Sequence, residues 1–368
     1  MIRKPFLITL CLFTFFLASC WDQNLLVNKK MVNGISFDLD QEDNVLAIVR
    51  ALNIENKGGG QFELKDELVK IKHPSVSGME IDVNNKLPGL IDVSKAHILL
   101  IGRDMAKKGI NPILELIYRP RQAYISSRVV IAEDKASDLI SLDAGTSPIA
   151  FVILKGLQSA ENTTKIPKET AFTAWTQITD TGRDIILPFV KKDENDKITI
   201  GGVDLFNGDK FTGISLPNEK GSLLLLLMDR LTKYSEMALQ LGEHRSISFR
   251  VKKIKRDLDV KVDKKTQKIN CKLNLVINLS VISYTADNAG QKLNNEKLNK
   301  EISQVLTKQA NEITNSLLEA NCDALGIGGI LSSSYPNLWK KINWEKDYKD
   351  VKFKTSVKAK INATGPVF

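Results

Sequence analysis

The sequence predicts an α+β fold of about three mixed α/β domains, and three patterns lead to that prediction. Short apolar strands alternate with helical periodicity in the first half of the chain. Residues 268–284 alternate strictly between apolar and polar, which is typical of a half-buried strand, and a long amphipathic stripe follows them. We therefore expect the C-terminal domain to be an antiparallel sheet packed on one long helix.

The first half of the chain reads as a mixed layer of strands and helices. Asn33–Asp40 and Val45–Asn53 are expected to be two strands joined by an acidic turn. A succession of strand, helix, strand and helix follows, at Val93–Gly102, Met105–Tyr118, Ser127–Ala132 and Lys135–Leu142. Such a succession favours helices packed against a sheet. Residues 155–190 have little periodicity.

The second half contains a hairpin, a helix and a strand-rich end. Ile198–Phe206 and Lys210–Leu216 flank a Gly208-Asp209 turn, which predicts a β-hairpin. The elements expected after it are a helix at Gly221–Leu241, one strand or a strand pair at Ile247–Val262, a strand at Lys268–Tyr284, a helix at Leu293–Asn321 and a closing strand at Lys352–Ala363. We expect domain boundaries that give 20–190, 191–245 and 246–368, after a signal peptide at 1–19.

The N-terminus has the pattern of a lipoprotein signal peptide. Arg3 and Lys4 precede the apolar stretch Phe6–Leu17, which spans only about 18 Å as a helix, against about 30 Å for a hydrocarbon core. Small residues then precede a cysteine in Leu17-Ala-Ser-Cys20. We expect cleavage before Cys20 and a diacylglyceryl group on its thiol, which anchors the chain to the outer face of a bacterial membrane. The alternative is an ordinary secretory signal that a cysteine happens to follow.

Charge and composition narrow the class of partner. The formal net charge is +9, spread thinly except for a denser patch at Arg250–Lys265. A basic surface is attracted to an anionic membrane within a Debye length of about 8–10 Å. No basic motif interleaved with aromatic residues is present, so nucleic acid is not expected as a partner.

The sequence contains no recognisable set of catalytic residues, and we expect neither an enzyme nor a metal or cofactor site. His73, His97 and His244 are the three histidines, and none has the spacing of a zinc site. No GxSxG motif is present. Cys11 leaves with the signal peptide. Cys271 and Cys322 could form a disulfide outside the cell, but two separate buried thiols are favoured.

A series of short motifs runs through the mature chain in a fixed order. They are Cys20-Trp-Asp22 with Asn33–Asp38, His97–Gly102 with Met105–Gly109, Arg119-Pro-Arg121 with Ser127–Ala132, Gly202–Phe206 with Lys210–Gly213, Asp323–Gly328 with Tyr335-Pro336, Trp339-Lys340 and Trp344, and Ile361–Gly365. In this order they resemble the Ger(x)C family, the C subunits of spore germinant receptors. The resemblance covers essentially the whole mature chain, and residues 155–190 match least well.

The resemblance implies a non-enzymatic lipoprotein on the outer face of the spore inner membrane. Members of the family work with an A subunit and a B subunit, both integral to that membrane, to sense nutrients and trigger germination. The implied partners are those two subunits, and membrane lipid through the diacylglyceryl group on Cys20. The resemblance leaves open whether this subunit binds nutrient directly.

Two other classes of function remain as hypotheses. A solute-binding lipoprotein of a membrane transporter would have two doubly wound lobes, and the antiparallel pattern near the C-terminus argues against it. A lipid-anchored envelope enzyme would need a catalytic constellation, which the sequence does not supply.

Overall fold

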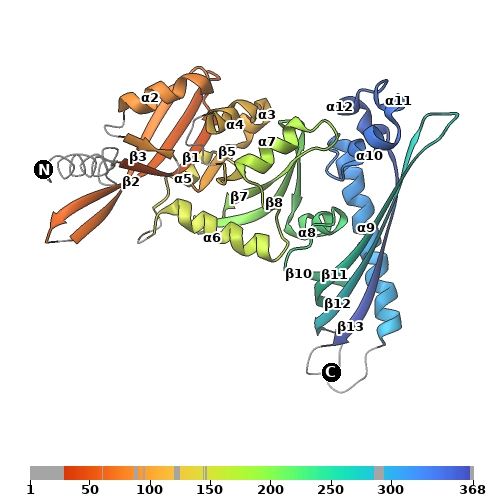
Figure 1. The fold of residues 1–368 in the computed structure, drawn as a ribbon. Helices are drawn as coiled ribbons and strands as arrows, with labels where there is room; N and C mark the ends of the chain where they lie inside the picture. Colours follow the sequence, from red (N-terminus) through yellow and green to blue (C-terminus); the bar gives the residue numbers. More distant parts are fainter. Residues whose placement is uncertain are drawn as a thin grey trace, which may run out of the picture.

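Two sheets organise the chain, as the ribbon in Figure 1 shows. The structure is a computed structural model that describes residues 29–364 except 60, 87–89, 94–95, 120–124, 144, 146 and 286–293. Within these residues, a nine-stranded sheet has the order β3-β2-β1-β5-β6-β7-β8-β9, with β4 paired to β1, and a four-stranded sheet has the order β10-β11-β12-β13. The predicted α+β class is confirmed.

The nine-stranded sheet is parallel at its centre and antiparallel at both ends. Its strands are β1 (Lys29–Leu39), β2 (Val45–Gly58), β3 (Gln61–His73), β4 (Leu90–Asp92), β5 (Ile98–Gly102), β6 (Arg128–Ala132), β7 (Ile186–Lys192), β8 (Ile198–Asn207) and β9 (Lys210–Pro217). Strands β1, β5, β6 and β7 pair in parallel, while β1-β2-β3 and β7-β8-β9 are antiparallel ribbons. The two predicted strand pairs, one joined by the turn at residues 40–44 and the other by the turn at 208–209, thus belong to opposite ends of one sheet.

Helices cover both faces of this sheet, because its central strands are apolar on both sides. In β5, Ile98 and Leu100 face one core, while Leu99 and Ile101 face the other. The first face is covered by α5 (Ala136–Ile140), α6 (Ile149–Asn162) and α8 (Asn218–Leu227), and the second by α2 (Met79–Lys86), α3 (Arg103–Lys108), α4 (Asn111–Tyr118), α7 (Ala171–Thr179) and the 3-10 turn η3 (Val76–Gly78).

The four-stranded sheet is covered on one face by a single long helix. Its strands are β10 (Ser235–Gly242), β11 (Arg245–Val262), β12 (Ile269–Tyr284) and β13 (Lys352–Thr364). Helix α9 (Asn295–Glu319) packs its apolar stripe on the sheet, and α10 (Ile327–Ser334), α11 (Pro336–Trp339), α12 (Trp344–Asp347) and η5 (Tyr348–Asp350) lie between α9 and β13 in the chain. Strands β10, β11 and β12 are antiparallel as predicted, whereas β13 runs parallel to β12. The difference arises because α9 carries the chain back to the end where β12 begins.

Helix α9 also covers the outer edge of β13 with a ladder of polar side chains. Asn299, Ser303, Thr307 and Asn311, four residues apart, meet alternate residues of β13. The contacts are Ile361 N to Asn299 Oδ1 (2.9 Å), Ala359 N to Ser303 Oγ (2.9 Å), Val357 N to Thr307 Oγ1 (3.0 Å) and Asn311 Nδ2 to Thr355 O (3.4 Å). The spacing of these side chains matches that of the strand because four residues of a helix and two residues of a strand both advance about 6 Å. An edge that could otherwise pair with another strand is thereby occupied.

Two predicted helices differ from the structure. The helix expected at Gly221–Leu241 ends as α8 at Leu227, and Ser235–Gly242 is strand β10, in which buried and exposed residues alternate. The helix expected at Met105–Tyr118 is divided into α3 and α4 by Gly109, whose φ of 129° interrupts the helical path.

Helix α8 joins the two sheets into one core. Residues Gly221–Leu227 are all buried, as expected for a helix that is surrounded on every side. One cluster of buried side chains extends from Ile48 in β2 through α8 to Ala359 in β13. The boundary expected at 190/191 falls within β7, and that at 245/246 within β11. The division into 20–190, 191–245 and 246–368 stays a prediction.

Candidate functional site

The predicted lipid-bearing residue, Cys20, lies outside the residues that the structure describes, as do Trp21 and Asp22. The first described strand, β1, begins at Lys29. Along the described chain, no helix is both long and apolar enough to cross a membrane. Lipidation of Cys20 therefore stays a prediction.

The three histidines belong to three different structural elements. His73 ends β3 and its Nδ1 lies 2.8 Å from Ser75 O. The His97 ring packs on Phe151, with 4.7 Å between ring centroids, and His244 lies in the turn between β10 and β11. Over the part of the chain that the structure describes, no group of three His, Cys, Asp or Glu side chains is placed to hold a metal ion.

Cys271 in β12 and Cys322 after α9 are free and buried, which is the arrangement that the sequence favoured. Burial is the main cause that raises the pKa of Cys271 to about 12 and the pKa of Cys322 well above its ordinary value. The thiolate form is therefore strongly disfavoured at both positions, and neither thiol is poised to act as a nucleophile.

A buried carboxylate, that of Asp323, organises the segment between α9 and β13. Its oxygens accept hydrogen bonds from Ile327 N (2.9 Å) and Gly328 N (2.7 Å) at the start of α10, and from Trp344 Nε1 (3.0 Å). The side chain is fully buried, and loss of hydration raises the pKa of Asp323 to about 7 against these three favourable donors. One side chain thus holds α10 and α12 together.

A second aspartate, Asp184, connects Asp323 to the nine-stranded sheet. The Asp184 carboxylate accepts from Gly208 N (2.8 Å), in the turn between β8 and β9, and from Asp323 N (2.7 Å). In return, Asp184 N donates to Asp323 O at 3.1 Å. Burial raises the pKa of Asp184 above its ordinary value. We call Asp184, Asp323, Trp344, Gly182 and Gly328 the aspartate junction.

Two glycines allow the backbones to meet at the aspartate junction. Gly329 N donates to Gly182 O at 3.0 Å. A Cβ on Gly182 would lie 2.7 Å from Gly329 N, and a Cβ on Gly328 would lie 2.4 Å from Trp344 Nε1, so neither position has room for a side chain. Gly326–Gly329 is rich in glycine, but its contact partner Gly182 lies well over a hundred residues earlier in the chain, so no local sequence pattern predicts the contact.

Three arginines lie around the same region. Burial, followed by repulsion from Arg230, lowers the pKa of Arg183, and burial lowers the pKa of Arg256. Arg256 Nη2 donates to Leu325 O at 3.3 Å, while the Nε atoms of Arg183 and Arg256 are buried without a hydrogen-bond partner.

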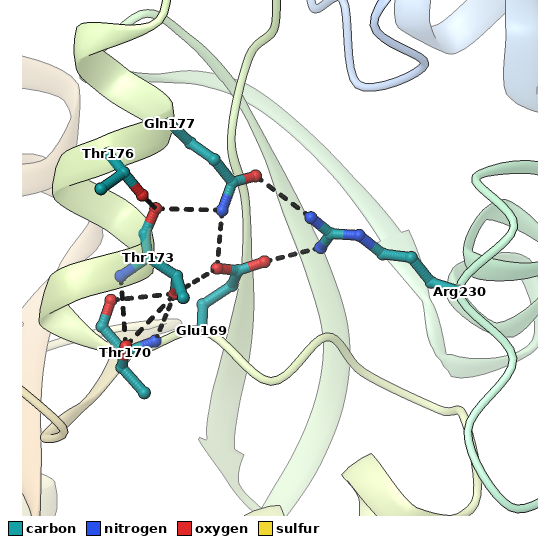
Figure 2. A network of polar contacts seen from close by, with 6 residues as sticks. All are labelled: Glu169, Thr170, Thr173, Thr176, Gln177 and Arg230. Carbon is teal, nitrogen blue, oxygen red and sulfur yellow. Dashed lines mark hydrogen bonds and ion pairs between the residues drawn. The ribbon is translucent and has the colours of Figure 1, made fainter.

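A second polar link ties α7 to the chain that enters the four-stranded sheet (Figure 2). Glu169, 1% exposed, accepts from Arg230 Nη1 (2.6 Å), Thr173 Oγ1 (2.6 Å) and Gln177 Nε2 (2.8 Å). Thr170 caps α7, with its hydroxyl accepting from Thr173 N. Since Arg230 lies between α8 and β10, this contact fixes where the chain leaves the first sheet.

A third network holds α3 on the ribbon formed by β8 and β9. Arg103 forms two hydrogen bonds with the buried Asp204 carboxylate, from Nε (3.1 Å) and Nη2 (3.0 Å), and Ser215 Oγ donates to it at 2.6 Å. The guanidinium also lies over the rings of Phe189 and Phe211. This network has the bidentate geometry of a structural ion pair.

Together, these groups position segments of the chain. The buried carboxylates of Asp38, Asp204 and Asp323 and the half-buried carboxylate of Asp184 each accept hydrogen bonds from backbone N–H groups or from arginine. The contact between Asp184 and Asp323 links the nine-stranded sheet to the segment that follows α9, while Asp38 holds α5 and Asp204 holds α3 on the nine-stranded sheet.

Two family models match the chain in sequence. Residues 22–192 match the family described as "Spore germination protein N-terminal domain", and residues 201–365 match "Spore germination B3/ GerAC like, C-terminal". Asp323–Gly328 and Trp344, which meet at the aspartate junction, lie within the second of these matched ranges.

Curated relatives and a solved structure agree with these matches. The spore germination protein GerQC of Bacillus cereus is 20% identical over 354 residues, which covers 95% of this chain and 96% of that protein. The putative spore germination protein YfkR of Bacillus subtilis (strain 168) is 24% identical over 135 residues, 34% of this chain and 35% of that protein. The crystal structure of the GerBC protein aligns with a TM-score of 0.59 at 15% identity, covering 89% of this chain and 97% of that one.

Proposed function

Because this chain belongs to the GerAC-like family of spore germination proteins, we propose that it is the C subunit of a nutrient germinant receptor, anchored to the outer face of the spore inner membrane by a lipid on Cys20. In this role it associates with integral-membrane A and B subunits and assists nutrient sensing. The observation that carries the proposal is the match of both halves of the chain, in order, to the two family models.

The geometry supports a binding role without catalysis. The buried carboxylates are occupied by structural donors, and burial raises the pKa of both described thiols. The two sheets share one core and are joined by the aspartate junction. A rigid two-sheet body suits a subunit that presents fixed surfaces to its partners.

A transporter's solute-binding lipoprotein would have a different architecture. Such a protein consists of two doubly wound lobes around a ligand crevice. In the described chain, the second sheet is backed by the single long helix α9, and its strand β13 closes the sheet without a second layer of helices on the other face. No observation favours that function for this chain.

Recovery of partners from spore membranes tests the proposal. The tagged chain should co-purify with integral-membrane subunits, and the variant Cys20→Ala should leave the membrane fraction and lose incorporated radiolabelled palmitate. The variant Cys271→Ala, which alters a buried thiol of the folded body, should keep both properties. Failure to recover any membrane partner would contradict the receptor role, and retention of the label in Cys20→Ala would contradict the anchor.

A further inference from the structure

The outer face of the four-stranded sheet is not covered by any described helix. In β12 the odd-numbered residues from Ile269 to Val281 are buried beneath α9, and the even-numbered residues point to the other side. The register places residues of β11 and β13 on this same side, as in the trio Asp259, Lys272 and Lys354. We call this side the lysine face.

The lysine face carries nine basic and three acidic side chains. The basic residues are Arg250, Lys253, Lys255 and Lys261 of β11, Lys272 of β12, and Lys352, Lys354, Lys358 and Lys360 of β13, and the acidic residues are Glu236, Asp257 and Asp259. Ion pairs join Arg250 to Glu236 and Lys261 to Asp259. Among the described residues, the other seven lysines form no ion pair, and Asp257 is the one acidic residue of the lysine face outside the two pairs.

A groove continues the positive charge around the edge of the sheet. It has a volume of about 910 Å³ and lies between α9 and β13, with the polar ladder of α9 among its lining residues. Lys300 and Lys308 of α9 and Lys358 and Lys360 of β13 line it, against the single acidic residue Glu296. Lys358 and Lys360 thus belong to both the groove and the lysine face.

The chemistry of this surface fits a lipid headgroup layer better than a protein partner. Protein interfaces are depleted in lysine and built around aromatic or aliphatic anchors. On the lysine face, the exposed large hydrophobic side chain among the described residues is Ile282, at 48% exposed. Lysine ammonium groups are strongly hydrated point charges on flexible stems, suited to an anionic surface without fixed geometry.

We propose that the lysine face and the adjoining groove dock on the anionic headgroups of the membrane to which the chain is attached. Each lysine near an anionic leaflet strengthens the attraction about fivefold, so seven unpaired lysines form a strong and salt-sensitive contact. The proposal rests on the membrane attachment in the proposed function and adds a second contact, at a site distant in sequence from Cys20.

Lysine accessibility in vesicles tests the docking. The full chain, isolated from membranes, is reconstituted into vesicles of phosphatidylcholine alone or mixed with phosphatidylglycerol, acetylated briefly and mapped by mass spectrometry. We expect acetylation of Lys272 and Lys354 to fall about fivefold or more in the anionic vesicles and to recover at high salt. The exposed Lys155 of α6 serves as the internal reference and should react equally in both vesicles.

Two triple variants distinguish the effect of lysines on the lysine face from the effect of the protein's net charge. Lys352→Glu, Lys358→Glu and Lys360→Glu together should abolish the protection of Lys272. The matched control, made of Lys165→Glu, Lys168→Glu and Lys191→Glu, changes three exposed lysines near the nine-stranded sheet that form no ion pair with a described residue, and it should retain the protection of Lys272.

Three outcomes decide the proposal. Protection that requires phosphatidylglycerol and the lysines of β13 supports it. Equal acetylation in the two kinds of vesicle would overturn it. Protection seen only in native spore membranes, and absent from anionic vesicles, would also overturn it and assign the face to an acidic protein. None of these outcomes changes recovery of the receptor subunits, so failure of the docking and failure of the receptor role are distinguishable.

Discussion

The variant Thr307→Val tests whether α9 is needed to complete the edge of β13. Thr307 Oγ1 accepts from Val357 N at 3.0 Å and donates to Val357 O at 3.2 Å. Valine keeps the branched shape and a similar helix propensity, so the substitution removes mainly these two hydrogen bonds. A buried donor left without a partner costs about 1–3 kcal/mol. Because the adjoining groove can admit water, we expect a loss of about 1–2 kcal/mol in the free energy of unfolding.

Urea unfolding followed by circular dichroism measures this loss as a lower midpoint with an unchanged slope. The matched control is Thr176→Val, an exposed threonine of α7 whose hydroxyl bonds only to Thr173 O in its own helix, and it should change the free energy by less than about 0.5 kcal/mol. Ser303→Ala, which deprives Ala359 N of its acceptor, should resemble Thr307→Val. If Thr307→Val and the control gave the same midpoint, the helix would not be supplying the edge with its hydrogen bonds.

Three further changes have outcomes that follow from packing and protonation. Gly182→Ala should destabilise the chain by about 1–3 kcal/mol, because the new Cβ would meet Gly329 N. The control Gly156→Ala in α6, where a Cβ would have no heavy atom within 4 Å, should stabilise the chain by about 0.5–1 kcal/mol. Urea unfolding midpoints compare the two variants, and equal effects would contradict the close contact at Gly182. The pKa of Asp323 is about 7 in the folded chain and 3.8, the ordinary value, in the unfolded chain. At a pH between these two values the folded chain holds a proton on Asp323 that the unfolded chain does not. The free energy of unfolding should therefore fall by up to about 1.4 kcal/mol per pH unit as the pH rises through this range. The difference between wild type and Asp323→Asn in unfolding free energy isolates this slope, and a difference independent of pH would refute it. Cys271 and Cys322 should react with a thiol reagent only after unfolding in urea, and rapid reaction of the native chain would show that they are accessible.

Strands with a clear pattern could be predicted from the sequence, while their partners could not. Lys268–Tyr284 alternates strictly and is strand β12, yet its parallel pairing with β13 depends on where α9 returns the chain. The prediction of a helix through Leu241 failed because the run of leucines in α8 continues into apolar residues of β10. Pairing with β11 decides that segment, and such tertiary contacts override local propensity.

The candidate surfaces were hidden in the sequence for the same reason. The patch at Arg250–Lys265 is visible as a cluster, but the lysines of β13 lie about a hundred residues later and join it only through the register. The aspartate junction likewise unites Asp184 and Asp323 across 139 residues. Local patterns predict which residues are basic or buried, and topology decides which of them meet.

The two sheets are held in one orientation by contacts of different kinds. The buried core that passes through α8 is apolar and without direction, so it resists separation of the sheets more than rotation. Hydrogen bonds have preferred directions, and two such contacts supplement that core, at the aspartate junction and between Glu169 and Arg230. Strands β1, β2 and β3 lie at one end of the molecule and the four-stranded sheet at the other (Figure 1). These contacts hold the lysine face in one orientation relative to β1, so loosening either of them should weaken the proposed membrane docking without removing a single lysine.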